Sequence, residues 1–294
     1  MENFKNLTEA DIKVIAPYFE KESSLSCDCS IGGSFIWSDF FQTTYAIIDE
    51  ALVFRIVLDK KIRYTYPIGK NIEAAFSLIE EDAKDSNTEI EFFVFSQDDL
   101  SSLKARYPSH EILDKREYYD YIYDYSSMCD FRGKKFSGQR NHINKFKRLY
   151  ENYSFEEINE KNKNELAEFF RGFIARSEKK NAAIEAEAIK IFDVLENMNE
   201  YRQFGGLLRV DGAIVGFSIA EKIGKTMFVH VEKADISYDG VYQMLVSCFA
   251  SHFADENVIY INREDDTGDE GLRKSKLSYH PIFLIEKYIF SVKE

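Results

Sequence analysis

The clearest pattern of hydrophobic and polar positions lies in the second half of the chain. Two apolar runs flank Asp211-Gly212, a pair that tolerates the positive φ of a hairpin turn, and Gly224-Lys225 marks a second turn. Apolar spacings of three and four then predict helices between later strands. The predicted elements are strands at 206–210, 213–220 and 227–232, a helix at 240–255, a strand at 258–262, a helix at 268–279 and a strand at 282–292.

The first half repeats this order of elements. Related landmarks are offset by similar amounts, with Asp49 lying 162 residues before Asp211 and His110 lying 170 before His280. We therefore expect a tandem repeat of one α/β unit, with domains at 1–131 and 132–294. The predicted elements are strands at 43–48, 52–58 and 62–66, a helix at 72–83, a strand at 90–95, a helix at 98–107 and a strand at 117–125, with further helices at 8–20, 164–177 and 186–198.

Composition narrows the class of protein. The 294 residues include 25 Phe and 18 Tyr but only four Pro and 14 Gly, which excludes a disordered or collagen-like chain. A net charge of −13 argues against coating of nucleic acid or anionic membrane by the whole surface. The sequence shows neither a signal peptide nor an apolar run of about 20 residues, so we expect a cytoplasmic protein without a transmembrane segment.

The charge is unevenly distributed. Residues 1–131 carry a net charge of −12 and residues 149–294 carry −8, whereas residues 132–148 hold seven basic side chains and no acidic one. This basic block is expected either to bind tRNA phosphates or an anionic headgroup, or to form a helix bridging two acidic domains. Its candidate anion-binding residues are Arg140, Lys145 and Arg148.

The four cysteines do not have the spacing of a metal site. Cys27 and Cys29 form a C-x-C, and Cys129 and Cys248 stand alone without histidines at ligand spacing. We predict structural thiols and no metal site.

Longer motifs resemble a known family. Placing a helix directly after the third strand of each meander resembles the acyl-CoA N-acyltransferase fold, here called GNAT-like. The stretches 135–146, 230–234, 240–243 and 260–281 resemble an uncharacterised bacterial family related to the C-terminal domain of phosphatidylglycerol lysyltransferases. The resemblance implies two tandem GNAT-like domains of mixed, mostly antiparallel sheets. It also implies transfer of an aminoacyl group, with acyl-CoA or aminoacyl-tRNA as possible donor and a lipid headgroup or small molecule as acceptor.

Polar residues gather where two strands end. Alternation places His230 and Glu232 on one face of their strand, and Asn262 and Glu264 on one face of another. If these strands are neighbours, the four side chains meet and supply a general base for acyl transfer. The alternative is a structural polar network.

The helix at 268–279 carries further candidates. Lys276 is expected to hold a carboxylate or phosphate, and Tyr279 to act as a general acid. In the alternative, Leu272 and Leu277 pack while the basic residues stay solvated. A separate prediction is that Asp265 or Asp266 forms an ion pair with Arg263 or Arg273. The candidate catalytic residues are Glu232, Asn262, Glu264 and Tyr279, and the candidate substrate-binding residues are His230, Lys233, Tyr242, Gln243, Arg263, Arg273 and Lys276.

The turn at 234–240 distinguishes between two hypotheses for the function. GNAT-like proteins bind a cofactor pyrophosphate at this turn, yet here it has one glycine and two carboxylates, Asp235 and Asp239, which would repel it. One hypothesis is an acyl- or aminoacyltransferase with its site in the C-terminal copy. The other is a non-catalytic ligand-binding or sensing module.

Overall fold

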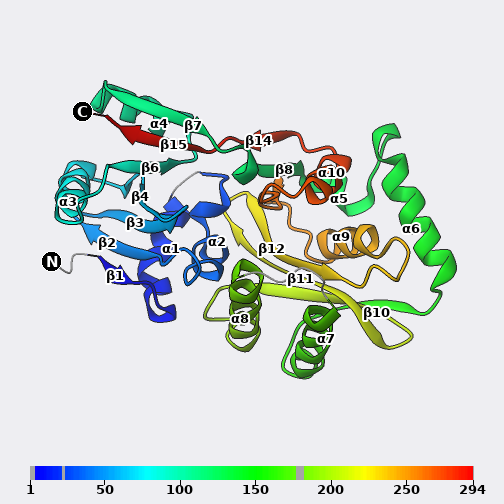
Figure 1. Ribbon diagram of the computed structural model, residues 1–294. Coiled ribbons are helices and arrows are strands. Elements are labelled where there is room, and N and C mark those ends of the chain that lie inside the picture. The colour runs from blue at the N-terminus through cyan, green and yellow to red at the C-terminus, as the bar shows by residue number, and fades with distance from the viewer. Residues whose placement is uncertain (1–3, 22–23, 177–181, 294) are drawn as a thin grey trace. The chain divides into compact units, whose positions relative to one another are not determined.

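A computed structural model describes residues 4–21, 24–176 and 182–293. Contacts divide the chain into two compact units (Figure 1). Unit 1 comprises Met1–Asp120, Asp265–Gly268 and Ile285–Glu294, and unit 2 comprises Tyr121–Glu264 and Asp269–Leu284.

Unit 1 is built on an eight-stranded sheet, counted over the described residues, with the strand order β1-β2-β3-β4-β6-β15-β7 and β5 beside β3. Helices α3 and α4 contribute Phe76, Ile79 and Leu103 to a core against Tyr64 and Phe92 of the sheet. The elements are β1 (Lys5–Asn6), α1 (Ile12–Lys21), α2 (Ile31–Ile36), β2 (Thr44–Ile48), β3 (Ala51–Leu58), β4 (Lys61–Thr65), β5 (Ile68–Gly69), α3 (Ile72–Asp85), β6 (Glu91–Val94), α4 (Gln97–Arg106), β7 (His110–Asp114) and β15 (Tyr288–Val292).

Unit 2 has a seven-stranded sheet over the described residues, in the order β14-β8-β13-β12-β11-β10-β9. Strands β10, β11 and β12 form the predicted antiparallel meander, and β13 pairs parallel to β12. The elements are β8 (Asp120–Asp124), α5 (Tyr125–Asp130), α6 (Ser137–Leu149), β9 (Tyr153–Glu157), α7 (Lys163–Arg176), α8 (Ala182–Glu196), β10 (Phe204–Val210), β11 (Ala213–Ile223), β12 (Thr226–Ala234), α9 (Val241–His252), β13 (Tyr260–Asn262), α10 (Glu270–Ser278) and β14 (Phe283–Ile285).

Helix α9 supplies much of the core of unit 2. Its residues Met244, Leu245 and Phe249 are buried in the cluster that also holds Leu208 and Met227 from the sheet. Helices α5 and α6 contact α9, and α7 contacts β11 and α8. The apolar residues whose spacing predicted α9 are therefore the residues that pack the helix against the sheet.

The last strand of each predicted copy lies in the other unit. Strand β8 pairs with β13 in unit 2, and β15 pairs with β6 and β7 in unit 1. The division therefore differs from the predicted boundary at residue 131, because residues 121–131 belong to unit 2 and residues 285–294 to unit 1. The strand predicted at 282–292 is two strands, interrupted at Glu286 and Lys287.

Most predicted elements are confirmed within a few residues. The helix predicted at 164–177 is α7, which ends at Arg176, and Ser177 lies outside the described residues. Strands β1, β5, β7 and β9 and helices α2 and α5 were not predicted; all are short, and β1 and β5 have two residues each.

Candidate functional site

The polar strand ends of unit 2 lie where a parallel ladder stops. Strand β12 pairs with β13 only from Thr226 and Tyr260 to Phe228 and Asn262. The prediction that these two strands are neighbours is confirmed. Beyond the last pair, β12 continues to His230 and Glu232, while the segment after Asn262 separates from β12 but stays hydrogen-bonded to Tyr121 of β8.

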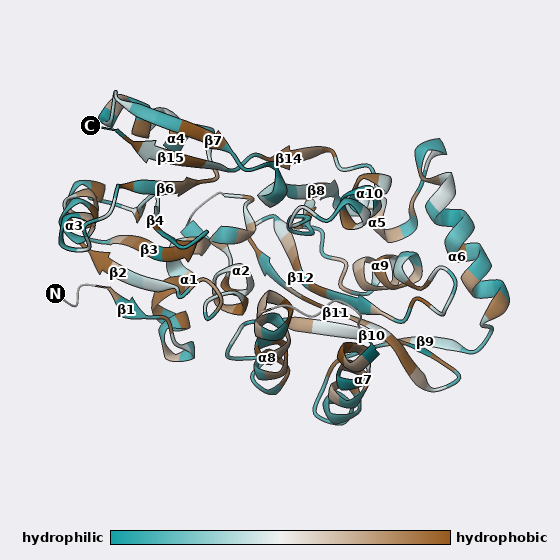
Figure 2. Ribbon diagram, viewed as in Figure 1, coloured by the Kyte–Doolittle hydropathy of each residue, from teal (hydrophilic) through white to brown (hydrophobic). Residues whose placement is uncertain are grey.

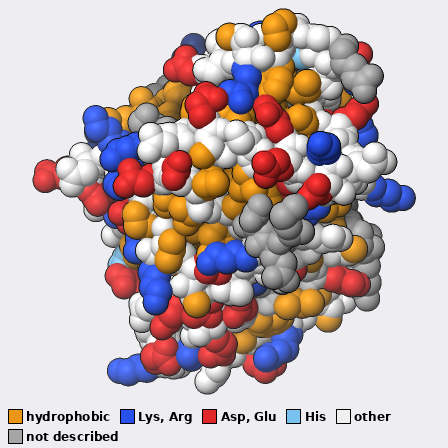
Figure 3. Space-filling view, turned by 90° about the vertical axis from the view of Figure 1, so that its left-hand side faces the viewer, with side chains coloured by type: hydrophobic (Ala, Val, Ile, Leu, Met, Phe, Trp, Pro, Cys, Tyr) orange, Lys and Arg blue, Asp and Glu red, His pale blue; other side chains and the backbone are white. Residues whose placement is uncertain are grey.

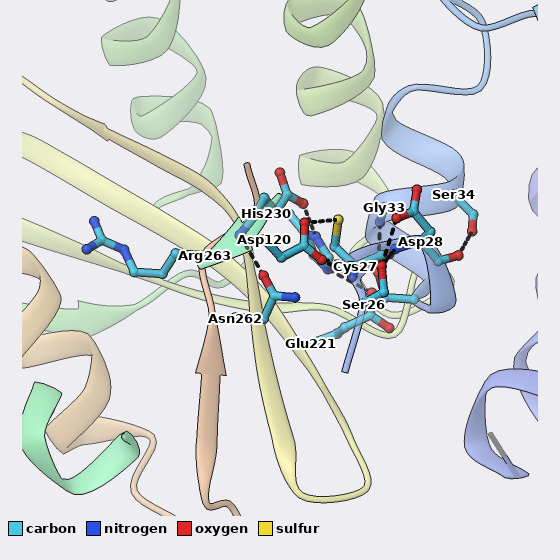
Figure 4. Close-up of polar contacts among 12 residues, drawn as sticks. Ser26, Cys27, Asp28, Gly33, Ser34, Asp120, Glu221, His230, Asn262 and Arg263 are labelled. Atoms are coloured by element: carbon cyan, nitrogen blue, oxygen red, sulfur yellow. Dashed lines mark hydrogen bonds and ion pairs between the residues drawn. The ribbon is translucent and has the colours of Figure 1, made fainter. Parts of the chain in front are cut away.

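His230 lies between two carboxylates. Its Nε2 atom is 2.8 Å from Oε1 of Glu221 on β11 (Figure 4). Its Nδ1 atom is 2.7 Å from Oε1 of Glu264. Strand β12 bulges here, because Ile219 pairs with Val231 while Ala220 pairs with Val229, which leaves His230 as the extra residue. Bulges of this kind redirect a side chain. The imidazole is fully buried.

These carboxylates control the charge of His230. Burial by itself lowers the pKa of His230, but the hydrogen bonds to Glu221 and Glu264 outweigh burial and raise the pKa to about 9. The imidazole is therefore positively charged at neutral pH.

Glu264 has an unusual backbone conformation. Its φ of 55° lies in the left-handed region, which costs energy for a residue with a side chain. Its N–H donates to Oδ1 of Asn262 at 2.6 Å, and its carbonyl accepts from the N–H of Tyr121 at 3.1 Å. His230, Asn262 and Glu264 thus form one connected group, as the alternation predicted.

Glu232 belongs to a second group. Its Oε1 atom accepts a hydrogen bond from Nη2 of Arg263 at 2.8 Å, and the Arg263 guanidinium lies 4.5 Å from the ring centroid of Tyr279. Arg263 points away from His230 (Figure 4). Its side chain is only 11% exposed, and its buried Nη1 atom has no hydrogen-bond partner among the described residues. Of the two arginines predicted to pair with Asp265 or Asp266, Arg263 instead pairs with Glu232, and the pairing with Arg273 stays a prediction.

Burial also affects Tyr279. Desolvation raises the pKa of its hydroxyl, while the charge of Arg263 opposes that shift. The group therefore remains a protonated phenol over the neutral range.

Helix α10 turns its basic side to the interior. Lys276 is buried and its Nζ donates to the carbonyl of Arg263, whereas Leu272 and Leu277 are 40% and 45% exposed. The alternative in which the leucines pack and the basic residues stay solvated is wrong for Lys276. The hydroxyl of Tyr123 donates to the Lys276 carbonyl at 2.8 Å and fixes the end of the helix.

Other predicted binding residues have structural contacts. Lys233 forms an ion pair with Glu187 of α8 at 2.8 Å. The hydroxyl of Tyr242 accepts from the N–H of Ala234 at 3.3 Å. Gln243 and Arg273 are half-buried, on α9 and α10 respectively.

The turn between β12 and α9 already uses its own polar groups. Asp235 accepts from the N–H of Ser237 at 3.0 Å, and the N–H of Asp239 donates to the hydroxyl of Tyr150 at 3.1 Å. Lys145 pairs with Asp239 at 2.9 Å. Gly240 has a φ of 79°, and a Cβ atom there would lie 2.3 Å from the carbonyl oxygen of His142. The turn is therefore packed against α6 rather than open for a pyrophosphate.

The basic block contains both engaged and free cations. Arg140 donates to the carbonyls of Phe131 and Gly133, and Lys145 is paired with Asp239 as described above. Lys147 and Arg148 are exposed and have no partner among the described residues. Figure 2 shows α6 as mostly hydrophilic, in keeping with its buried Ile143 and Phe146 occupying one side only.

Unit 1 contains a separate buried polar cluster. Lys287 Nζ lies 2.6 Å from Asp28 Oδ2, 2.8 Å from Asp120 Oδ1 and 3.4 Å from Cys27 Sγ. The Cys27, Asp28 and Asp120 atoms are close enough to ligate a metal ion, but the Lys287 ammonium already lies among them (Figure 4 shows the three ligand residues). The single ammonium offsets one of the two carboxylate charges. The four cysteines are free thiols.

Two surface features bear on partners. Within the described ranges, no helix combines the length and apolar character needed to cross a bilayer. On the face shown in Figure 3, basic and acidic side chains are interspersed, so that face has no continuous field of one sign.

The sequence analysis missed Glu221. The predicted strand ended at Ala220, although the strand continues to Ile223. A carboxylate directly after a long apolar run was the available signal, since a charge at the end of a buried strand needs a partner.

Comparison with known sequences identifies related proteins. A family model described as phosphatidylglycerol lysyltransferase, C-terminal, matches residues 23–291. An uncharacterized protein of Mycoplasmoides gallisepticum is 27% identical over 179 residues, which are 59% of this chain. The match covers 56% of that relative, so this chain spans about half the length of the curated relative.

Solved structures share the fold. A conserved protein of unknown function from Bacteroides thetaiotaomicron is 34% identical over all of both chains, with a TM-score of 0.92. A C-terminal domain assigned to a lysylphosphatidylglycerol synthetase of Agrobacterium fabrum is 14% identical, with 98% of this chain and 93% of that chain covered and a TM-score of 0.70. A tandem GNAT protein from the clavulanic acid biosynthesis pathway is 8% identical over 99% and 98% of the chains, with a TM-score of 0.52. The tandem GNAT-like fold predicted from the sequence is confirmed.

Proposed function

Because the chain belongs to the family of phosphatidylglycerol lysyltransferase C-terminal domains, we propose that it transfers an aminoacyl group from an ester donor to a hydroxyl or amine acceptor, with its site in unit 2. The GNAT-like fold and the family membership support an acyltransferase in general. The identity of the donor, the identity of the acceptor and the roles of individual residues are what we propose here.

The proposal rests on the buried Nη1 atom of Arg263, which lacks a hydrogen-bond partner within the part of the chain that the structure describes. A buried donor on a charged group without an acceptor costs free energy, so such a group in a native structure requires an explanation. Glu232 already neutralises the guanidinium through Nη2. The remaining N–H groups therefore suit a neutral ester carbonyl, whose oxygen gains negative charge as the acceptor attacks it.

The neighbouring side chains supply the proton transfers. In the proposed reaction the Glu264 carboxylate takes the proton of the acceptor, whose oxygen or nitrogen then bonds to the carbonyl carbon. The bond between that carbon and the donor's ester oxygen breaks, and the Tyr279 hydroxyl gives its proton to the departing oxygen. Asn262, which is fully buried, holds the backbone of Glu264 in place.

The turn before α9 favours aminoacyl-tRNA over acyl-CoA as donor. Its N–H groups at Ser237 and Asp239 already donate within the unit, so few remain for a pyrophosphate. Lys147 and Arg148 on α6 are free to contact tRNA phosphates. Lys233, Tyr242, Gln243, Arg273 and Lys276 stay proposed binding residues, together with Arg140 and Lys145, whereas both ring nitrogens of His230 are engaged by carboxylates.

The test measures donor consumption. The purified chain is incubated with a mixture of charged tRNAs or with acyl-CoA, together with lipid-headgroup and amine acceptors, and products are detected by mass. We expect transfer from aminoacyl-tRNA, and a loss of about 100-fold or more in rate for Arg263→Met with a smaller loss for Arg263→Lys. Arg171→Met, which removes an exposed arginine on α7 paired with Glu168, is the control and is expected to keep the full rate.

A non-catalytic binding module remains the second candidate, because the cofactor turn is closed. That candidate is favoured if no donor is consumed with any acceptor while charged tRNA still binds. Consumption of acyl-CoA alone would contradict the proposed donor.

A further inference from the structure

We propose that Glu221 and His230 are positioning residues for Glu264, holding its carboxylate in one orientation so that it can take a proton from the acceptor. This inference rests on the proposed function, which makes Glu264 the base. It adds Glu221, a residue that neither the motifs nor the alternation of β12 indicates.

The hydrogen bonds themselves require a charged imidazole. Both ring nitrogens of His230 lie within 2.8 Å of a carboxylate oxygen. A neutral imidazole has one N–H group and one lone pair, and the lone pair would face an oxygen. The imidazolium donates to both, so each hydrogen bond is charge-assisted. The charged groups that act on His230 are Glu221 on β11 and Glu264 after β13.

The two carboxylates are not equivalent. The Glu221 side chain is 3% exposed, whereas the Glu264 side chain is 17% exposed. Glu221 lies behind the imidazole and has no outward path to a substrate. Glu264 is the most exposed of the three residues. The group therefore runs from Glu221 in the core, through His230, to Glu264 near the surface.

Glu264 is held so that one of its oxygens stays available. Oε1 accepts from His230, and within the described part of the chain Oε2 has no hydrogen-bond partner. Asn262 and Tyr121 fix the backbone in its left-handed conformation. A residue with a strained backbone that is held by three hydrogen bonds is typical of functional sites, where a fixed geometry is needed for a reaction.

The three residues together carry one net negative charge. Glu232 and Arg263 nearby form a neutral pair, so this charge is not cancelled by them. Glu221 therefore contributes a charge as well as a hydrogen bond, because without it the His230–Glu264 pair would be neutral.

The first measurement does not depend on any substrate. The nitrogen shifts of His230 are followed by NMR against pH in the intact chain labelled at its five histidines, with His230→Gln used for assignment. We expect a midpoint near 9 in the wild type, and a midpoint displaced toward 6.5 in Glu221→Gln. Glu157→Gln removes the carboxylate beside His252, an exposed pair at 2.9 Å in the same unit, and is expected to leave His230 unchanged. A wild-type midpoint near 6.5 would overturn the proposal.

The second measurement separates positioning from packing. In the transfer assay Glu221→Gln is expected to lower kcat by about tenfold or more with little change in KM, and to move the alkaline limb of the pH profile to lower pH. Glu157→Gln keeps the wild-type profile. If Glu221→Gln displaces the His230 midpoint but leaves kcat and the profile unchanged, the pair is structural and the inference is wrong. If the wild type consumes no donor, the proposed function fails, and with it the catalytic role given to Glu221, whereas the NMR result still decides whether the charged group exists.

Discussion

The Nζ atom of Lys287 lies 2.8 Å from Oδ1 of Asp120, and both side chains are almost completely buried in unit 1. Asp120 is the first residue of β8, and Lys287 directly precedes β15. The backbone carbonyl of Lys287 also accepts from the N–H of Lys115 at 3.0 Å. The ion pair therefore joins the two chain segments from which the exchanged strands begin.

Replacing Lys287 by Met is expected to destabilise the protein strongly. The fully buried Asp120 would then lose its cation, and breaking a buried pair by removing one partner costs about 3–5 kcal/mol. Urea unfolding followed by circular dichroism measures the free energy of unfolding.

Lys293→Met is the matched control for that variant. Lys293 lies near the same end of the chain but is 35% exposed and pairs with exposed carboxylates, so its removal is expected to change the free energy of unfolding by less than about 1 kcal/mol. A similar small change for Lys287→Met would show that the buried cluster does not stabilise unit 1.

The elements of the fold were predictable, but the membership of two strands was not. The alternation at 117–125 and 282–292 indicates which positions are buried. Because a strand would bury the same positions in either sheet, the alternation does not identify the sheet to which the strand belongs. The lysine at 287 was the visible signal, since a charge within an apolar strand marks an interruption. Strand exchange depends on backbone pairing between distant segments, which local patterns do not encode.

The site was partly predictable for a related reason. Alternation correctly grouped His230 with Glu264, but β13 ends at Asn262, so the contact comes from the left-handed backbone of Glu264 beyond the strand. It placed Glu232 with them, whereas the bulge at His230 and the pairing with Arg263 put Glu232 in a second group. A bulge changes the face of each later residue and leaves no reliable trace in sequence.

Stability is expected to depend on pH through His230. Its pKa is raised from 6.5 to about 9 on folding, so its contribution is fully present below pH 6.5 and is lost as pH rises through 9. We expect the free energy of unfolding to fall by about 3 kcal/mol over this window relative to His230→Gln. Denaturant titrations of both proteins at several pH values measure the difference. Parallel pH curves for the two proteins would contradict the charged state of His230.

Helix α10 offers a direct comparison of two positions. Leu277 is exposed and Lys276 is buried with its Nζ bonded to the carbonyl of Arg263, which reverses the usual preference of the two residue types. Leu277→Gln is expected to change the free energy of unfolding by less than about 0.5 kcal/mol. Lys276→Met is expected to cost about 1–3 kcal/mol, because the carbonyl loses its donor. Thermal and urea unfolding of both variants check the order, and a larger loss for Leu277→Gln would mean that the leucine side of α10 is covered.

The free cations of α6 are expected to govern the binding of tRNA. Lys147 and Arg148 are unpaired within the described residues, whereas Lys145 is paired with Asp239. Each cation that contacts a phosphate releases counterions, so Lys147→Glu with Arg148→Glu is expected to weaken binding and to reduce the slope of log affinity against log salt by about two. Lys145→Glu is expected to reduce it by less, since its charge is already compensated.

The measurement is fluorescence anisotropy with labelled tRNA between about 50 and 200 mM salt. Lys161→Glu with Lys225→Glu changes the net charge equally at exposed positions outside α6, and is expected to keep the wild-type slope. If both double variants change the slope equally, binding follows net charge alone and α6 has no specific role. If neither changes it, the cations of α6 do not contact phosphate, and the helix is the basic bridge that the sequence offered as the alternative.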